Sequence, residues 1–197
     1  MMIKTESIIE MLENTLNKEI SKVTLNDLDN ITYLRISRTS IDDILIVDSS
    51  DLRYFHNLKE LSIENCMINF QLIEELRKIK NLIKISFIHC EVIDDVEDYF
   101  EQLSIYELVL NDVIGLNNTK FSNIKKLTFV GCSFNCIIDN IETLDISRSP
   151  DIKIDFNNIC MNELVINEIQ YINNLYPKCK IIVKNGYDEV VKEISND

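Results

Sequence analysis

The chain has 197 residues, of which 46% are hydrophobic and 27% charged, a composition typical of one globular domain. Its net charge of −13 argues against a general nucleic-acid binder, which needs basic residues to neutralise phosphates, and against docking on anionic membranes. The same charge favours a basic protein partner.

The first twenty residues predict an amphipathic helix, over residues 3–20, that caps one end of the fold. Ser7 with Glu10 predicts a capping box at its start. Charges interrupt every apolar run here, unlike in a secretory signal, and no later run is long enough to span a bilayer. We therefore expect a cytoplasmic protein. The apolar stripe of the helix is Ile8, Ile9, Leu12, Leu16 and Ile20.

A pattern of apolar residues then recurs eight times, at intervals of 17 to 27 residues. Its form is apolar-x-x-apolar-x-apolar-x-x-(Asn/Cys/Thr)-x-apolar, which is the leucine-rich-repeat pattern. The copies at 105–116 and 161–171 match loosely, and the last copy is incomplete. The copies lie at 31–41, 58–68, 82–92, 105–116, 124–134, 141–152, 161–171 and 178–186.

Each copy predicts a short strand, because two apolar residues separated by one residue point to the same side of a strand. One such strand cannot bury its apolar side alone, so the copies must stack into a solenoid with a continuous core. The predicted inward pairs are Leu34/Ile36, Leu61/Ile63, Ile85/Phe87, Leu108/Leu110, Leu127/Phe129, Leu144/Ile146, Leu164/Ile166 and Ile181/Val183.

The segments between the strands differ in length. Residues 70–80 place apolar residues at helical spacing, whereas residues 134–140 leave room only for an extended return. Residues 188–194 predict a short closing helix. We therefore divide the chain into an N-terminal helical cap (1–24), leucine-rich repeats (25–186) and a C-terminal cap or tail (187–197).

The segment Lys18 to Ile44, followed by Phe55 to Ile68, resembles the beginning of internalin-type bacterial leucine-rich-repeat domains. There a helical cap leads into a theta-leucine strand, here VTLNDL at residues 23–28. The resemblance implies an α/β leucine-rich-repeat solenoid: a right-handed horseshoe with a parallel sheet of about eight strands on its concave face, and helices and extended segments on its convex face. It also implies that the concave sheet binds proteins.

The six cysteines are expected to be reduced thiols in a chain without an export signal. Cys132 and Cys136 have a CxxxC spacing, but no second pair of cysteine or histidine residues completes a zinc site. The ninth repeat position is expected to bond to the backbone at the turn that follows each strand. This structural turn ladder is Thr39, Cys66, Cys90, Cys132 and Ser149.

No catalytic constellation is found in the sequence. His89 and Cys90 are adjacent, so on a strand they point to opposite faces and cannot act as a nucleophile and its base. The acidic pairs Asp42/Asp43 and Asp94/Asp95 follow predicted strands, and we expect them to be solvated turn residues. Three glycines in the whole chain are too few for a phosphate-binding loop. We predict no enzymatic activity, no metal and no cofactor.

The repeat phase also predicts which side chains leave the concave face. These outward positions carry seven basic and seven acidic residues, so this face is neutral while the rest of the chain is acidic. A sheet of about 400 Å² is smaller than the roughly 800 Å² that a partner usually covers, so a partner should also touch turns or a cap. The predicted partner-binding residues are Tyr33, Arg35, Arg38, Glu60, Glu64, Lys84, Ile88, His89, Glu107, Val109, Lys126, Val130, Asp145 and Arg148.

The sequence thus favours a monomeric, non-enzymatic protein–protein interaction module that binds a protein partner, and neither nucleic acid nor membrane, through the concave face. Two alternatives remain open at this point. One is an immunity or inhibitor protein that neutralises a toxin or an enzyme. The other is an effector that is secreted without a cleavable signal.

Overall fold

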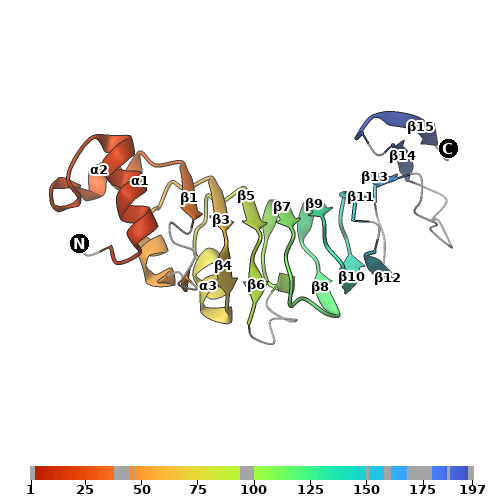
Figure 1. Cartoon of the computed structure of the whole chain (residues 1–197), viewed down its shortest axis with the longest axis horizontal. Helices are drawn as coiled ribbons and strands as arrows, with labels where there is room; N and C mark the ends of the chain where they lie inside the picture. Colours follow the sequence, from red (N-terminus) through yellow and green to blue (C-terminus); the bar gives the residue numbers. More distant parts are fainter. Residues whose placement is uncertain are drawn as a thin grey trace.

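In the computed structural model the chain winds as a solenoid, with helices at its N-terminal end and a β-hairpin at its C-terminal end (Figure 1). The structure describes residues 3–37, 45–46, 48–93, 100–149, 151–157, 161–167, 179–185 and 187–194.

One long sheet runs along the upper side of the solenoid in Figure 1. Within the described residues it has nine strands, and neighbouring strands are parallel except for the last pair. In spatial order they are β1 (Tyr33–Ser37), β3 (Glu60–Glu64), β5 (Lys84–Ile88), β7 (Ile105–Asn111), β9 (Ile124–Val130), β11 (Thr143–Arg148), β13 (Glu163–Asn167), β14 (Lys180–Lys184) and β15 (Val190–Ile194).

The strands of the long sheet are aligned so that equal repeat positions pair. Leu61 lies opposite Leu34 on one side and Ile85 on the other. The same alignment continues through Leu108 and Leu127 and on to β14. Each of the eight predicted repeats contributes one parallel strand, so the predicted solenoid with a continuous parallel sheet is confirmed.

The chain returns to the long sheet through shorter extended segments and few helices. The predicted helix at residues 70–80 is present as α3 (Phe70–Leu76), and η2 (Ser49–Tyr54) is a 3-10 helix. Residues 134–140 are extended, as predicted, because they contain β10. The two small parallel sheets are β2 (Leu45–Ile46) with β4 (Cys66–Ile68) and β6 (Glu91–Val92), and β8 (Thr119–Phe121) with β10 (Asn135–Asp139) and β12 (Lys153–Asn157).

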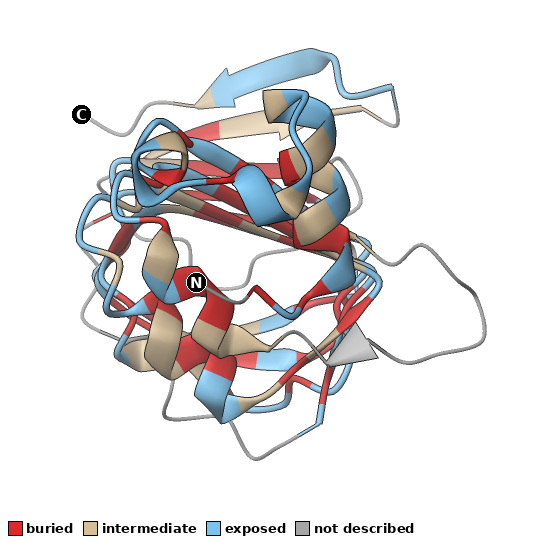
Figure 2. Ribbon diagram, turned by 90° about the vertical axis from the view of Figure 1, so that its left-hand side faces the viewer, coloured by how far each residue is buried: buried red, intermediate tan, exposed pale blue. Residues whose placement is uncertain are grey.

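The core lies between the long sheet and the return segments, where buried residues gather in the end-on view (Figure 2). All predicted inward pairs are buried there except Val183, which is partly buried. Phe87, Phe100 and Phe121 stack edge to face, with ring centroids 6.1 and 5.6 Å apart. Because neighbouring turns share this core, each turn stabilises the next.

The N-terminal cap differs from the sequence prediction in three ways. The helix α1 (Glu6–Leu16) starts after Thr5, so the predicted capping box of Ser7 with Glu10 is wrong. It ends at Leu16 because Asn17 adopts a left-handed conformation, with φ of 51°. The predicted strand at residues 23–28 is also wrong, since η1 (Ile20–Lys22) is followed by the helix α2 (Leu25–Asp29).

The helix α2 replaces the expected strand because its first turn is capped locally. Thr24 accepts a hydrogen bond from the backbone N–H of Asp27, and the Asp27 carboxylate accepts one from the backbone N–H of Thr24 at 2.9 Å. This capping box satisfies backbone donors that a short helix would otherwise leave free. The apolar residues Ile8 and Leu12 of α1 are fully buried against the first repeat.

The predicted closing helix at residues 188–194 is wrong, because this segment forms β15, antiparallel to β14. The pairing shifts register between Val183 and Lys184, which marks a β-bulge. Lys192 lies in the middle of the strand and is exposed. A bulge and a central lysine both discourage further strand pairing, so β15 ends the sheet as a cap.

Candidate functional site

The outer face of the long sheet is the side that points away from the core. It carries the residues that the repeat pattern assigns to the predicted concave, partner-binding face. Exposed and buried side chains alternate along β1, as expected for a strand. Tyr33 and Arg35 are exposed, and Leu34 and Ile36 are buried. The predicted partner-binding residues that the structure describes lie on this face or at the ends of its strands, and none of them is buried. Arg38 lies outside the described residues.

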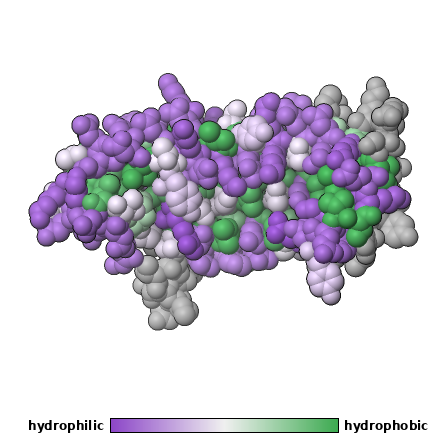
Figure 3. Space-filling view, turned by 90° about the horizontal axis from the view of Figure 1, so that it is seen from above, coloured by the Kyte–Doolittle hydropathy of each residue, from purple (hydrophilic) through white to green (hydrophobic). Residues whose placement is uncertain are grey.

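The middle of the face is less accessible than the repeat pattern predicts. Ser62 and Thr128 point outward in β3 and β9 but are each only 7% exposed, and Val165 and Ser147 are also buried. These side chains are short, and two of them donate to carboxylates of their own strands: Ser62 to Glu64 at 3.0 Å and Ser147 to Asp145 at 2.7 Å. Short buried side chains therefore lie between the charged groups of this face. Seen from above, the molecule is mostly hydrophilic (Figure 3).

Ion pairs link the charged groups across the strands. Arg35 of β1 donates to Glu64 of β3 at 2.6 Å, which raises the pKa of the Arg35 guanidinium. Glu107 of β7 lies 3.3 Å from the Nζ atoms of both Lys84 and Lys126. The carboxylate side chains of Glu64 and Glu107 are 14% and 18% exposed, against 57%, 36% and 45% for Arg35, Lys84 and Lys126. A partner approaching this part of the face therefore meets cations first.

Left-handed residues end four neighbouring strands at the same repeat position. Asn65, His89, Asp112 and Gly131 have φ between 48° and 63°. The backbone N–H of each donates to a carbonyl of the next strand at 2.8 to 2.9 Å. Of these four residues only His89 is among the predicted partner-binding residues, and the left-handed role of the position was not predicted. The signal was present, because Asn, Asp, His and Gly are the residues that most readily adopt positive φ.

The turn ladder residues follow directly after these left-handed positions. The thiols of Cys66, Cys90 and Cys132 are buried and donate to backbone carbonyls at 3.0 to 3.4 Å. Ser149 accepts a hydrogen bond from the backbone N–H of Cys132 at 3.0 Å. Burial raises the pKa of Cys90 and of Cys132, which keeps both thiols protonated and poorly nucleophilic. Thr39 lies outside the described residues.

A row of asparagines lines the opposite edge, where the strands of the long sheet begin. Asn57 donates to the carbonyl of Asp29 at 2.9 Å, and Asn81 donates to the carbonyl of His56 at 3.0 Å. Asn123 donates to the carbonyl of Glu101 in the same way, at 3.4 Å. Each amide thus ties one turn of the solenoid to the preceding turn. The recurring Asn-Leu or Asn-Ile pair at the start of these repeats is the sequence signal for this role, and it was not among the predictions.

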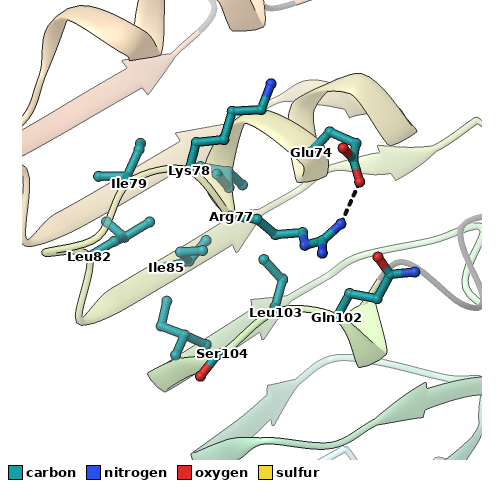
Figure 4. Close-up of a pocket in the computed structure, with 11 residues that line it drawn as sticks. Glu74, Arg77, Lys78, Ile79, Leu82, Ile85, Gln102, Leu103 and Ser104 are labelled. Carbon is teal, nitrogen blue, oxygen red and sulfur yellow. Dashed lines mark hydrogen bonds and ion pairs between the residues drawn. The ribbon is translucent and has the colours of Figure 1, made fainter.

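A cavity of about 390 Å³ lies between α3 and the start of β7 (Figure 4). Its floor is apolar and includes the buried residues Ile85 and Leu103, whereas charged side chains stand at its rim. Arg77 at this rim donates to Glu74 at 2.6 Å. The lining holds neither histidine nor cysteine, so this cavity has no candidate nucleophile–base pair.

The sequence-based candidates for catalysis and metal binding do not come together where the structure describes them. His89 Nδ1 lies 3.3 Å from Asp112 Oδ2 on an exposed surface, while the neighbouring Cys90 is buried. No group of three or more His, Cys, Asp or Glu residues in the described part of the chain could hold a metal ion. The acidic pairs Asp42/Asp43 and Asp94/Asp95, and Cys160, lie outside the described residues.

Comparison with protein-family models gave no match, and comparison with curated proteins gave none either. No helix among the described residues is long and apolar enough to cross a membrane.

Proposed function

We propose that the chain is a non-enzymatic protein-binding module and that its partner covers the outer face of the long sheet. The observation that carries this proposal is the aligned register of the repeats, which places equal positions side by side over eight parallel strands. The result is one continuous surface of regularly spaced side chains. Such extended repeat surfaces serve as binding faces in solenoid proteins.

We further propose that the solenoid is of the leucine-rich-repeat type and is internalin-like at its first repeats. Three features support this assignment. The apolar template positions pair with one another across the strands. A buried polar or thiol side chain bonds to the backbone after the strands, as in Cys66 and Cys132. A helical cap covers the first strand, since α1 contacts β1.

The chemistry of the face favours a protein over other ligands. Charged side chains are paired with each other across strands, and Val109 and Ile88 lie half-buried among them. A mixture of aliphatic, hydroxyl and paired charged groups is typical of protein interfaces. A phosphate backbone would instead require a run of unpaired cations.

The experiment compares tagged wild-type chain with two matched variants as baits in native extracts. Val109→Arg places a long charged side chain in the middle of the outer face, in β7. Ile137→Arg makes the same change on the small sheet, in β10, where Ile137 is also a half-buried aliphatic residue. We expect Val109→Arg to lose a protein that wild type and Ile137→Arg both retain. A wild-type bait that enriches no protein over the Val109→Arg bait would contradict the proposal.

A further inference from the structure

Three hollows meet around the turn that joins α3 to β5, at residues 77–83. The cavity in Figure 4 is one of them, and the other two measure about 660 and 350 Å³. Lys78 and Ile79 line two of the three, and Lys80 and Asn81 also line two. The three hollows thus surround residues 77–83, at the edge of the solenoid where the strands of the long sheet begin.

This corner gathers positive charge in a chain whose net charge is −13. Two of the carboxylates that line the hollows already have basic partners: Glu74 pairs with Arg77 and Glu75 with Lys78, each at 2.6 Å. The third, Asp29, lies 3.4 Å from His56, a contact that is an ion pair only when His56 is protonated. In contrast, Lys59 and Lys80 form no ion pair with any residue that the structure describes. Their charge is left for an external group.

Two large apolar side chains are exposed on this side of the solenoid: Ile83, which lines the same hollow as both lysines, and Tyr106 on the neighbouring strand. Ile83 is 47% exposed and Tyr106 is 56% exposed. They occupy the same position on neighbouring strands, since the residues that follow them, Lys84 and Glu107, pair in register. Exposed aliphatic and aromatic groups beside unpaired cations suit a ligand that carries both apolar and anionic groups.

We infer that an acidic segment of a protein partner binds at the basic corner, defined as Lys59, Lys80, Ile83 and Tyr106. This inference rests on the proposed function and names the chemistry of the partner. The net charge of the chain favours a basic partner, but the local charge at this corner favours carboxylates. A long polyanion such as a nucleic acid would meet the acidic remainder of the chain, whereas a short acidic peptide segment contacts only the corner.

The basic corner is continuous with the outer face of the long sheet. Ile83 and Tyr106 each precede a central residue of that face, Ser86 and Val109, by three residues, or about 10 Å along the strand. A partner on the face can therefore reach the corner. The sheet of about 400 Å² is smaller than the area that a partner covers in an interface of standard size. Contact with the basic corner would add to that area.

The test measures binding of a fluorescein-labelled copolymer of glutamate and tyrosine by fluorescence anisotropy. Lys59→Glu/Lys80→Glu reverses the two unpaired lysines of the corner. Lys22→Glu/Lys153→Glu is the matched control, because it changes the net charge equally at exposed lysines elsewhere. Ile83→Ser is compared with Ile114→Ser, which alters an isoleucine that is 61% exposed outside the corner.

We expect the copolymer to bind wild type, to bind Lys59→Glu/Lys80→Glu about tenfold or more weakly, and to bind Lys22→Glu/Lys153→Glu nearly as well as wild type. Ile83→Ser should weaken binding further than Ile114→Ser. The inference is overturned if the copolymer does not bind, if both charge-reversal variants lose binding equally, or if oligothymidylate binds as tightly as the copolymer. Self-association of the wild type that Lys59→Glu/Lys80→Glu abolishes would make a second copy the occupant and would also overturn it.

The two proposals fail separately. If the copolymer does not bind, but Val109→Arg still loses the captured protein, the outer face remains the binding surface and only the acidic partner segment is wrong. If Val109→Arg keeps every captured protein, the proposed function is wrong whatever the copolymer does.

Discussion

The carboxylate of Asp51 accepts a hydrogen bond from the backbone N–H of Thr5 at 2.7 Å, across 46 residues of sequence. It also accepts one from the backbone N–H of Lys4 at 2.9 Å. Asp51 is only 1% exposed, so no solvent can replace it. The side chain therefore joins the N-terminal cap to the first return segment of the solenoid.

We predict that Asp51→Ala lowers the free energy of unfolding by roughly 2–4 kcal/mol, because two backbone donors lose their acceptor. Asp51→Asn keeps one acceptor oxygen and should cost less. Urea unfolding followed by circular dichroism measures both effects. Asp155→Ala, at an exposed position of β12, is the control and should change stability little. Equal stability of Asp51→Ala and wild type would show that the cap does not depend on this contact.

Gly131 is predicted to resist substitution at the end of β9. Its φ is 63°, and an added Cβ would collide with the carboxylate of Asp112. Gly131→Ala should lower the free energy of unfolding by about 2 kcal/mol, from left-handed strain and displacement of Asp112. Adding Asp112→Gly removes the collision, so the double variant should be more stable than the sum of the two single effects predicts. Strict additivity would contradict the collision.

Asp27 gives the N-terminal cap a defined pH dependence. The hydrogen bond from Lys18, together with those from the backbone and side chain of Thr24, lowers the pKa of Asp27 from 3.8 to about 2. Because the folded pKa is below the unfolded one, the stabilisation is complete above the unfolded pKa and is lost as the pH falls through the folded pKa.

We therefore predict that Asp27→Asn destabilises the chain at pH 6, and that the difference from wild type shrinks between about pH 4 and pH 2. Thermal unfolding of both proteins over this range measures the effect. Asp139→Asn is a control on the small sheet. A difference that stays constant down to pH 2 would show that these hydrogen bonds do not lower the pKa of Asp27.

The buried cysteines should be chemically inert in the folded chain. Burial raises the pKa of Cys136 to about 12 and also raises the pKa of Cys179. Since the thiolate is the reactive form, a maleimide should label a Cys160→Ser variant only after unfolding. Denaturant-dependent labelling with mass spectrometry measures this. Rapid labelling of Cys90 or Cys132 in native buffer would contradict their place in the turn ladder.

The sequence predicted the solenoid because its period-two apolar pairs, such as Leu61 with Ile63, recur in every copy. Burial of apolar surface is the dominant favourable contribution to protein folding, so the pattern of buried pairs can be recognised in the sequence. The caps were predicted less well, because local hydrogen bonds decide them. A two-residue contact between Thr24 and Asp27 turns an expected strand into α2, and hairpin pairing turns an expected helix into β15.

The sequence predicts which side chains point toward the candidate face, but not how exposed each of them is. Alternation along a strand places Ser62 and Thr128 outward, but it cannot show that both are buried on this face. The pairing of Glu107 with both Lys84 and Lys126 depends on register between strands, which no single repeat reveals. The basic corner was missed for the same reason, since Lys59 and Lys80 come together only when the turns stack.

The most direct test of the central claim places a photo-crosslinking amino acid at Val109 or, as the matched control, at Ile137. Each variant is irradiated in native extract, and the crosslinked products are identified by mass spectrometry. The account predicts that the position 109 probe crosslinks a distinct partner protein and the position 137 probe does not. Binding at the outer face of the long sheet would be contradicted by either of two results. One is that the position 109 probe crosslinks no protein, and the other is that a partner protein is crosslinked from position 137 alone.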